Sequence, residues 1–355
     1  MNTSNTVYIG TYTSSAGKGI YICEYDSTRG ILLQKSVCEI ENPSYVITSL
    51  DKRFAYAVIE CRNYMGQKGG GVAAFRINQD SGALTFMNSC PTLGEDPCHL
   101  CVDRANTRLS VANYSGGAVS SFLLGSDGSI IPPASVTEHN GSSKDKLRQE
   151  AAHVHFVGFT PDEELLYAVD LGLDRVLFYK PESRQDGFFL RDDETALIFE
   201  PGSGPRHLVY GKTNLIYAIT ELTSQVSVFN LRRGEASRPI QTLSLLPAGF
   251  SGQSYASAVK ISHNGRFLCA ANRGHDSISV YRIEKNGLLQ LAGCFPSGGK
   301  YPRDIAFSHN GNFLFAANQN SDSVTVLQFD SRTGALSPPQ QILKLPKPVC
   351  LNTMF

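Results

Sequence analysis

The sequence predicts an all-β fold, a seven-bladed β-propeller, and three observations lead to this prediction. The 355-residue chain has 32 glycines and 17 prolines, which favours many tight turns over long helices. A segment repeats along the chain with a clearest period of 46 residues. Each copy holds four short runs of strand-forming residues, which is the content of one propeller blade. We therefore expect a single domain over residues 1–355, because radially stacked blades allow one domain to exceed the usual size.

The repeat is clearest in the C-terminal third of the chain. Residues 255–272 align without a gap with residues 301–318. Both copies contain a Ser-His-Asn-Gly turn followed by an apolar run that ends in Ala-Ala-Asn. Glycine and asparagine supply the turn conformations, while β-branched and aromatic residues favour the strands. Each repeat thus predicts a first strand, a turn, a second strand, an alternating third strand and a weaker fourth strand.

Looser copies upstream bring the number of repeats to seven. The first strands begin near Pro43, Pro97, Ala152, Pro205, Ala256, Pro302 and Pro348, and the second strands lie near Val7, Phe54, Leu109, Leu165, Leu215, Phe267 and Phe313. The chain begins with a second strand and ends with a first strand, residues 349–355. These two strands should share one blade and close the ring by pairing, which removes exposed sheet edges. Residues 138–150 are polar, and we expect them to be a disordered surface loop.

Composition excludes several classes of partner. Lys plus Arg and Asp plus Glu both number 32, so no positive field is expected to attract nucleic acid or an acidic membrane surface. No stretch approaches the roughly 20 apolar residues of a membrane helix. The polar N-terminus does not resemble a signal peptide, and nine cysteines are an odd number, which favours reduced thiols in the cytoplasm. Cys98 and Cys101 lack a second ligand pair, so no metal is expected. The oligomeric state is left open.

The repeat also predicts where the site lies. In each blade the first strand starts, and the second strand ends, on the same face, so these positions should surround one mouth of the central channel. The first-strand positions are Ser44, Cys98, His155, Arg206, Ser257, Arg303 and Val349, and the residues after second strands include Tyr114, Leu171, Glu221, Arg273 and Gln319. The mouth should therefore collect His155, Arg206, Glu221, Arg273 and Arg303, with His99, His153 and His207 close by. Arginines of this kind bind carboxylate or phosphate in a bidentate manner, which favours an anionic substrate.

Structural interpretations stand beside this one. Asn272 and Asn318 recur in register, which favours a role in capping turns. His153 and His155 alternate on a strand as metal ligands can, but no clear carboxylate partner accompanies them. Arg206 and Arg303 can instead form ion pairs between neighbouring blades. The chain has no G-x-S-x-G motif, so no covalent nucleophile is expected.

A set of motifs carries a family resemblance. They are Gly204-Pro-Arg-His207, Glu221 followed by Leu-Thr-Ser, Ala271-Asn-Arg273, Tyr301-Pro-Arg303 and His153-Val-His155. Across seven blades this set resembles the propeller lactonase family that contains bacterial 6-phosphogluconolactonase and fungal carboxy-cis,cis-muconate lactonising enzyme. The resemblance implies that His155, Arg206, Arg273 and Glu221 are catalytic. The family's usual Ser-Pro-Asp-Gly turn is Ser-His-Asn-Gly here, which should change only the turn.

The resemblance implies hydrolysis of 6-phosphogluconolactone to 6-phosphogluconate in the pentose phosphate pathway, without a cofactor. In the expected mechanism His155 or Glu221 activates water, Arg273 stabilises the oxyanion, and Arg206 with Arg303 holds the phosphate. The expected substrate-binding residues are Arg303, His153, His207, His99, Tyr114 and Gln319. The alternatives are a muconate-type cycloisomerase, a calcium-dependent lactonase and a non-catalytic propeller that binds proteins at its rim. Unlike charged residues gathered at one mouth favour an enzyme over a scaffold.

Overall fold

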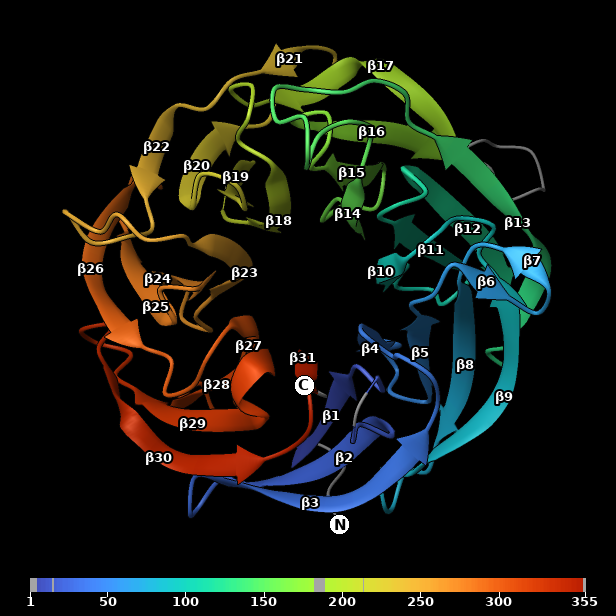
Figure 1. Ribbon diagram of the computed structural model, residues 1–355, viewed down its shortest axis with the longest axis horizontal. Coiled ribbons are helices and arrows are strands. Elements are labelled where there is room, and N and C mark those ends of the chain that lie inside the picture. Colours follow the sequence, from blue (N-terminus) through green and yellow to red (C-terminus); the bar gives the residue numbers. More distant parts are fainter. Residues whose placement is uncertain (1–4, 15, 182–188, 213, 354–355) are drawn as a thin grey trace. The chain divides into compact units, whose positions relative to one another are not determined.

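The structure is a computed structural model that describes residues 5–14, 16–181, 189–212 and 214–353 (Figure 1). Within these ranges the chain forms seven sheets of four or five strands, with a two-stranded hairpin beside them. The strands pair antiparallel except at one edge, where residues 236–237 pair in parallel. The one helical element described is the 3₁₀ turn η2 (Gln319–Ser321). The seven sheets confirm the predicted all-β seven-bladed propeller. No helix in the described ranges has the length and hydropathy needed to cross a membrane.

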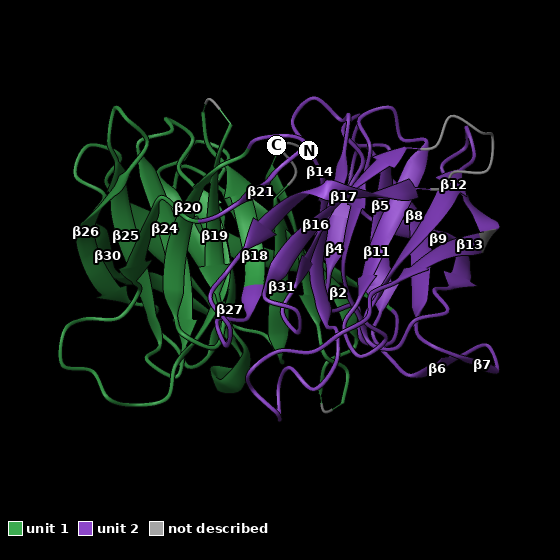
Figure 2. Ribbon diagram, turned by 90° about the horizontal axis from the view of Figure 1, so that it is seen from above, with its two compact units in different colours: residues 1–39, 206–231, 239–355 green, residues 40–205, 232–238 purple. Residues whose placement is uncertain are grey.

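Contacts divide the chain into two compact units (Figure 2). Unit 1 comprises residues 1–39, 206–231 and 239–355, and unit 2 comprises residues 40–205 and 232–238. The four blades of unit 1, in hydrogen-bonded order, are β31 (Pro348–Thr353), β1 (Thr6–Thr11), β2 (Gly19–Asp26) and β3 (Ile31–Glu39); β18 (Pro205–Tyr210), β19 (Leu215–Thr220), β20 (Gln225–Asn230) and β22 (Gln241–Ser244); β23 (Tyr255–Ile261), β24 (Phe267–Arg273), β25 (Ser277–Ile283) and β26 (Leu289–Pro296); β27 (Pro302–Phe307), β28 (Phe313–Asn318), β29 (Ser323–Phe329) and β30 (Leu336–Lys344).

Unit 2 contains three blades of the same design. They are β4 (Val46–Thr48), β5 (Phe54–Ile59), β8 (Gly71–Ile77) and β9 (Leu84–Pro91); β10 (Pro97–Val102), β11 (Arg108–Asn113), β12 (Ala118–Leu124) and β13 (Ile130–Glu138); β14 (Val154–Phe159), β15 (Leu166–Asp170), β16 (Arg175–Pro181), β17 (Phe189–Ile198) and β21 (Ala236–Ser237). The hairpin of β6 (Asn63–Tyr64) and β7 (Gln67–Lys68) also lies in this unit. The predicted second strands coincide with β5, β11 and β15, whereas the first strand expected near Pro43 begins three residues later, at Val46.

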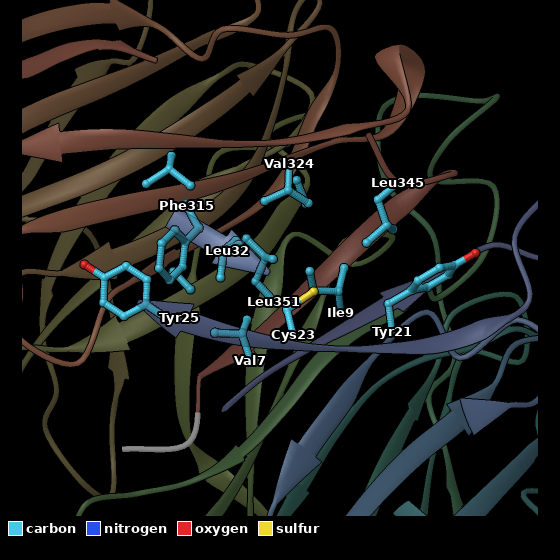
Figure 3. Packing of buried hydrophobic residues seen from close by; sticks show 13 residues of the cluster. Val7, Ile9, Tyr21, Cys23, Tyr25, Leu32, Phe315, Val324, Leu345 and Leu351 are labelled. Carbon is cyan, nitrogen blue, oxygen red and sulfur yellow. The ribbon is translucent and has the colours of Figure 1, made fainter. Parts of the chain in front are cut away.

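The terminal strands share one blade, as the sequence predicted. Strand β1 pairs with β31 in antiparallel register, with Val7 opposite Thr353 and Ile9 opposite Leu351. Figure 3 shows Ile9 and Leu351 within an apolar cluster that also contains Phe315 from β28. The ring of Tyr25 packs edge-on against Phe315, with centroids 5.2 Å apart. The pairing and this cluster join the first and last strands of the chain into one packed blade.

The loop 138–150 is ordered, so the prediction of disorder was wrong. Gln149 is fully buried and its Nε2 donates a hydrogen bond to the Leu171 carbonyl at 2.8 Å. The Ser143 hydroxyl donates to Asp174 Oδ2 at 2.6 Å. His139 is also buried, and its ring nitrogens contact Asp170 and the Tyr179 hydroxyl. Polar composition suggested disorder because few apolar groups could be buried, but buried polar groups that find hydrogen-bond partners fix the loop instead.

The recurring asparagines serve the fold, which supports the structural interpretation. Asn272 is fully buried, and its Nδ2 lies 3.1 Å from the Leu245 carbonyl and 3.2 Å from the Ser279 hydroxyl. Asn318 Nδ2 similarly donates to Thr325 Oγ1 at 3.1 Å. Each amide thus ties the end of a second strand to the neighbouring third strand.

Candidate functional site

Five of the seven first-strand positions predicted from the repeat lie in β-bulges. In β14 the register shifts between Val154 and Phe156, so His155 has no residue opposite it on β15. Equivalent shifts occur at Cys98 in β10, Ser257 in β23, Arg303 in β27 and Val349 in β31. A bulge bends the strand and re-aims the side chain of the extra residue. In these five blades the positions that vary between repeats are therefore also the positions where the sheet departs from regular pairing.

Glu221 and two arginines form a buried ionic cluster in unit 1. Glu221 follows β19, and its Oε2 lies 3.0 Å from Arg206 Nε and 2.6 Å from Arg273 Nη2. All three side chains are no more than 5% exposed. Arg206 Nη1 also contacts His207 Nε2 at 3.2 Å and donates to the Ser257 carbonyl. The structure thus brings together four residues of the predicted site.

Two tyrosines and the backbone hold Arg273. Its guanidinium carbon lies 5.3 Å from the centre of the Tyr301 ring and 5.9 Å from that of Tyr255. Its Nε and Nη2 donate to the carbonyls of Tyr255 and Ala256, each at 3.3 Å. A cation near aromatic faces is stabilised by the ring quadrupole, and each additional hydrogen bond restricts the guanidinium further. Arg273 is therefore fixed in position by its surroundings.

Arg303 is more accessible than the other two arginines. It is only partly buried, and its Nη2 donates to the Tyr12 hydroxyl at 3.0 Å while the guanidinium carbon lies 5.4 Å from the Tyr12 ring centre. Gln319 lies in the same unit, where its backbone N–H donates to the Tyr301 carbonyl. The Gln319 side-chain oxygen is buried without a hydrogen-bond partner among the described residues. An oxygen of this kind is suited to accept a hydrogen bond from a ligand.

Asp304 is a buried carboxylate that sequence reasoning missed. It is 2% exposed, and its two oxygens accept backbone hydrogen bonds from Ile305 at 2.9 Å and Leu351 at 2.8 Å. Burial raises the pKa of its carboxyl above the ordinary value, an effect partly offset by Lys260, the two N–H groups and Arg206. Because Leu351 belongs to β31, Asp304 ties the first strand of one blade to that of the next.

His155 of unit 2 has aromatic and sulfur neighbours. His155 is 6% exposed, and its Nδ1 lies 3.8 Å from Cys98 Sγ. The Tyr114 ring packs edge-on to His155, with centroids 5.4 Å apart, and stacks on His153 at 4.6 Å. The Tyr114 hydroxyl accepts a hydrogen bond from Arg148 Nη2 at 3.3 Å. Tyr114, His153 and His155 thus form one group, as predicted.

The other two imidazole environments of this unit are structural in character. His153 Nδ1 lies 3.1 Å from the Tyr114 carbonyl and its Nε2 lies 3.1 Å from Glu150 Oε1, so both nitrogens face acceptors. His99 lies between the rings of Tyr45 and Phe156, with centroids 4.1 and 3.8 Å away. Such enclosure between aromatic rings is typical of a packing role.

The family follows from comparison with known proteins. Residues 6–353 match the family model described as "Lactonase, 7-bladed beta-propeller". The chain belongs to this lactonase family. It is 38% identical over 282 residues to the 6-phosphogluconolactonase of Bacillus subtilis strain 168, covering 78% of this chain and 77% of that one. It is 32% identical over 301 residues to the 6-phosphogluconolactonase of Formosa agariphila, covering 82% and 83%.

A solved structure resembles this lactonase closely. The periplasmic gluconolactonase of Pseudomonas aeruginosa superposes with a TM-score of 0.92 at 33% identity, covering 98% of both chains. The names of these relatives thus differ in whether the sugar lactone is phosphorylated. The family resemblance stated from the motifs is confirmed over nearly the whole chain.

The described part of the lactonase contains no group of three or more His, Cys, Asp or Glu side chains arranged to hold a metal ion. Ordinary ion pairs and hydrogen bonds instead account for the acidic groups of the candidate site. Sequence reasoning missed Tyr255, Tyr301 and Tyr12, which hold the arginines, as well as Asp304. The three tyrosines could have been found from the sequence, because each lies within two residues of the end of a predicted strand.

Proposed function

We propose that this lactonase hydrolyses 6-phosphogluconolactone to 6-phosphogluconate, as a cytoplasmic enzyme of the pentose phosphate pathway. The observation that carries the proposal is the buried cluster of Arg206, Glu221 and Arg273, with the more accessible Arg303 in the same unit. Fixed guanidinium groups at strand ends are suited to an anionic substrate whose reaction develops negative charge. The two relatives that bear the name 6-phosphogluconolactonase support the choice of lactone.

The chemical step requires one proton acceptor and one group that stabilises an oxyanion. His155 takes a proton from water, and the oxygen of that water forms a bond to the lactone carbonyl carbon. Arg273 donates hydrogen bonds to the carbonyl oxygen as it becomes negative. Collapse of the intermediate breaks the bond to the ring oxygen, which takes the proton back from the imidazolium. The products are a carboxyl group, which then ionises, and a hydroxyl group on one open chain.

His155 is assigned to this step from the repeat register and from its bulge position in β14. Its contacts with Cys98 and Tyr114 fix the ring. A neutral imidazole can accept a proton from water as a general base.

Glu221 is better suited to position the arginines than to act as the base. Its Oε2 forms ion pairs with both guanidinium groups. A carboxylate that is paired with two cations is stabilised in its ionised form and is a weak proton acceptor. We therefore assign Glu221 to hold Arg273 toward the carbonyl oxygen and to neutralise charge that would otherwise be buried unpaired.

Arg303 is the residue assigned to the phosphate. It is only partly buried and keeps its guanidinium beside the Tyr12 hydroxyl. Arg206 was predicted to share this role and that remains a prediction, although the contacts of Arg206 with Glu221, His207 and Ser257 favour a positioning role. Gln319, whose buried oxygen has no partner among the described side chains, is assigned to a sugar hydroxyl.

A second candidate is hydrolysis of an unphosphorylated gluconolactone, and the likeness to the Pseudomonas gluconolactonase favours it. A timed hydrolysis assay with both lactones, corrected for spontaneous ring opening, separates the two. We expect kcat/KM to be higher for the phosphorylated lactone, and Arg273→Gln to abolish most of the activity toward both. Equal kcat/KM values for the two lactones would favour the second candidate. No catalysed hydrolysis of either lactone would contradict the proposed activity.

A further inference from the structure

A pocket lies in unit 1, away from the candidate lactonase site. Its volume is about 790 Å³. Three chain segments line it: the β18–β19 turn, the β23–β24 turn and the β25–β26 turn. Leu215, Tyr217 and Ile261 contribute apolar surface, and the Tyr217 hydroxyl donates to the Gly287 carbonyl at 2.8 Å. The volume lies in the range of sites for small organic ligands.

This pocket is at the opposite ends of the strands that carry the ionic cluster. Arg206 is near the start of β18 and Tyr210 ends it, while Glu221 follows β19 and Leu215 begins it. Likewise, Arg273 ends β24, whose first residue Phe267 adjoins the pocket turn. Strands of six or seven residues span roughly 20 Å at about 3.3 Å per residue. A ligand in the pocket therefore does not touch the lactonase residues.

The pocket is strongly basic. Lys212, Arg266, Arg282 and Lys285 line it, against one acidic residue, Glu284. The two lysines and Arg266 are exposed, and Arg282 is partly buried. Neither the ion pairs nor the side-chain hydrogen bonds found among residues 5–14, 16–181, 189–212 and 214–353 involve these four cationic groups. By contrast, Arg206 and Arg273 of the lactonase site are paired with Glu221. Unpaired like charges around one concavity repel each other and are stabilised by an anion.

Local structure holds the two arginines beside each other. Phe267 is buried, and the guanidinium carbons of Arg266 and Arg282 lie 5.8 and 5.3 Å from its ring centre. Arg282 is also directly opposite Phe267 in the β24–β25 register. Lys212 reaches the same turn, since its Nζ is 3.9 Å from where a Cβ on Gly265 would lie. Arginines fixed on an aromatic ring present their donors with little further loss of freedom on binding.

We propose that this pocket binds a small anion that carries one or two phosphate groups. Arg266 and Arg282 contact the phosphate oxygens, and Lys212 and Lys285 supply additional positive charge. Planar guanidinium groups match the geometry of phosphate oxygens, and the apolar residues leave room for an organic part of the ligand. The proposal does not depend on the lactone that the enzyme hydrolyses, because the two sites share no residue.

The test measures binding of inorganic pyrophosphate by isothermal titration calorimetry, with ionic strength held constant by sodium chloride. The test protein is the double variant Arg266→Gln/Arg282→Gln. The matched control is Arg29→Gln/Arg332→Gln, which removes the same charge from exposed positions of unit 1 outside the pocket. A third variant, Arg303→Gln, accounts for pyrophosphate binding at the lactonase site.

We expect saturable binding to the wild type, the matched control and Arg303→Gln with similar dissociation constants. Loss of two charge-assisted contacts should weaken binding to the pocket variant by at least roughly tenfold. Circular dichroism and the melting temperature check that this variant is folded. The proposal is wrong if the folded pocket variant binds as the wild type does, if only Arg303→Gln loses binding, or if the wild type shows no saturable binding. If the pocket variant does not fold, the single variants Arg266→Gln and Arg282→Gln replace it under the same criteria.

Discussion

The residues of the predicted site differ in character between the two units. In unit 1, Arg206 and Arg273 share the Glu221 carboxylate, and their remaining contacts are to carbonyls, tyrosine rings and His207. In unit 2, His155 has a thiol and a tyrosine ring as neighbours. Buried charges must be paired to be tolerated, whereas a neutral imidazole can be buried among aromatic and sulfur groups at little cost.

This difference suggests a division of labour between charge stabilisation and proton transfer. An arginine that is locked in place responds to developing negative charge without rearrangement, which is the property of an oxyanion-stabilising group. An imidazole can take up a proton and release it again during one reaction cycle. Each of the following variants tests either charge stabilisation or proton transfer.

The largest expected effect is on proton transfer. His155→Ala should lower kcat by about 10²–10⁴-fold, because general acid-base groups commonly contribute that much. The wild-type kcat should rise with pH as an imidazole base loses its proton, and the variant should lose this rise. Steady-state kinetics from pH 5 to 9 provide the measurement.

The matched control for this prediction is His99→Gln, which removes an imidazole that is enclosed by Tyr45 and Phe156 in the same unit. It should change kcat by less than roughly threefold, because His99 has no assigned chemical role. An unchanged kcat in His155→Ala, with the rise with pH retained, would assign the base to another residue. His153 and His207 would then be tested in the same way.

The second-largest expected effect concerns charge stabilisation by the arginines. Glu221→Gln removes a carboxylate that is paired with both Arg206 and Arg273. Removing one partner of a buried ion pair typically costs about 3–5 kcal/mol of unfolding free energy, and kcat should fall by roughly 10²-fold as Arg273 loses its orientation. Urea unfolding and steady-state kinetics measure the two effects.

Glu235→Gln is the matched control, because Glu235 pairs with Arg232 at an exposed site and its removal should change little. The pH profile separates positioning from catalysis. If Glu221 only positions the arginines, Glu221→Gln retains the rise in kcat with pH that a histidine base produces. Loss of that rise in Glu221→Gln, but not in His155→Ala, would identify Glu221 as the base.

The sequence predicted the architecture well because the repeat has a physical cause. Each blade needs the same turns, and the same amide tether at the end of the second strand, so Asn272 and Asn318 recur at the same register position. The loop 138–150 was misjudged because its stability depends on partners such as Leu171 and Asp174, which are distant in sequence until the blades form.

The site was predicted in part. Repeat register identified Arg206, Glu221 and Arg273, because residues that differ between otherwise identical blades are free of the fold's own requirements. Their pairing could not be predicted, since register gives the face of a strand and not the direction in which a long side chain extends. Asp304 escaped notice because its partners are backbone N–H groups, including that of Leu351, which leave no pattern in the sequence.

A moderate effect should separate substrate binding from catalysis within unit 1. Arg303→Gln should lower kcat/KM for the phosphorylated lactone by roughly 10–100-fold, which is the cost of losing one charge-assisted contact. Activity toward gluconolactone should change little, because that substrate has no phosphate. Arg332→Gln, an exposed arginine paired with Asp330, is the matched control. Equal losses with both lactones would show that Arg303 does not contact the phosphate.

The smallest expected effect is on the pH dependence of stability, and it distinguishes two buried carboxyl groups of unit 1. Glu221 is neutralised by arginines, whereas Asp304 is held by two backbone N–H groups, and burial raises the pKa of its carboxyl. Because the folded pKa lies above that of the unfolded chain, the folded protein binds this proton more tightly. The contribution of Asp304 to stability is therefore present at low pH and is lost as pH rises through the folded pKa.

Asp304→Asn removes this pH dependence. Near pH 4 the variant should be less stable than the wild type by about 1 kcal/mol, because one amide oxygen cannot replace both carboxylate oxygens. At pH 8 the difference should shrink or reverse, since only the wild type buries a charge there. Urea unfolding of both proteins at the two pH values measures this change. Asp330→Asn is a control of opposite sign, because hydrogen bonds from Arg332 and Thr333 lower the pKa of the Asp330 carboxyl and its contribution is lost as pH falls. The expected result is that the difference in unfolding free energy between Asp304→Asn and the wild type changes with pH, in the direction opposite to that of Asp330→Asn. If it does not change, or changes in the same direction, burial does not raise the pKa of the Asp304 carboxyl.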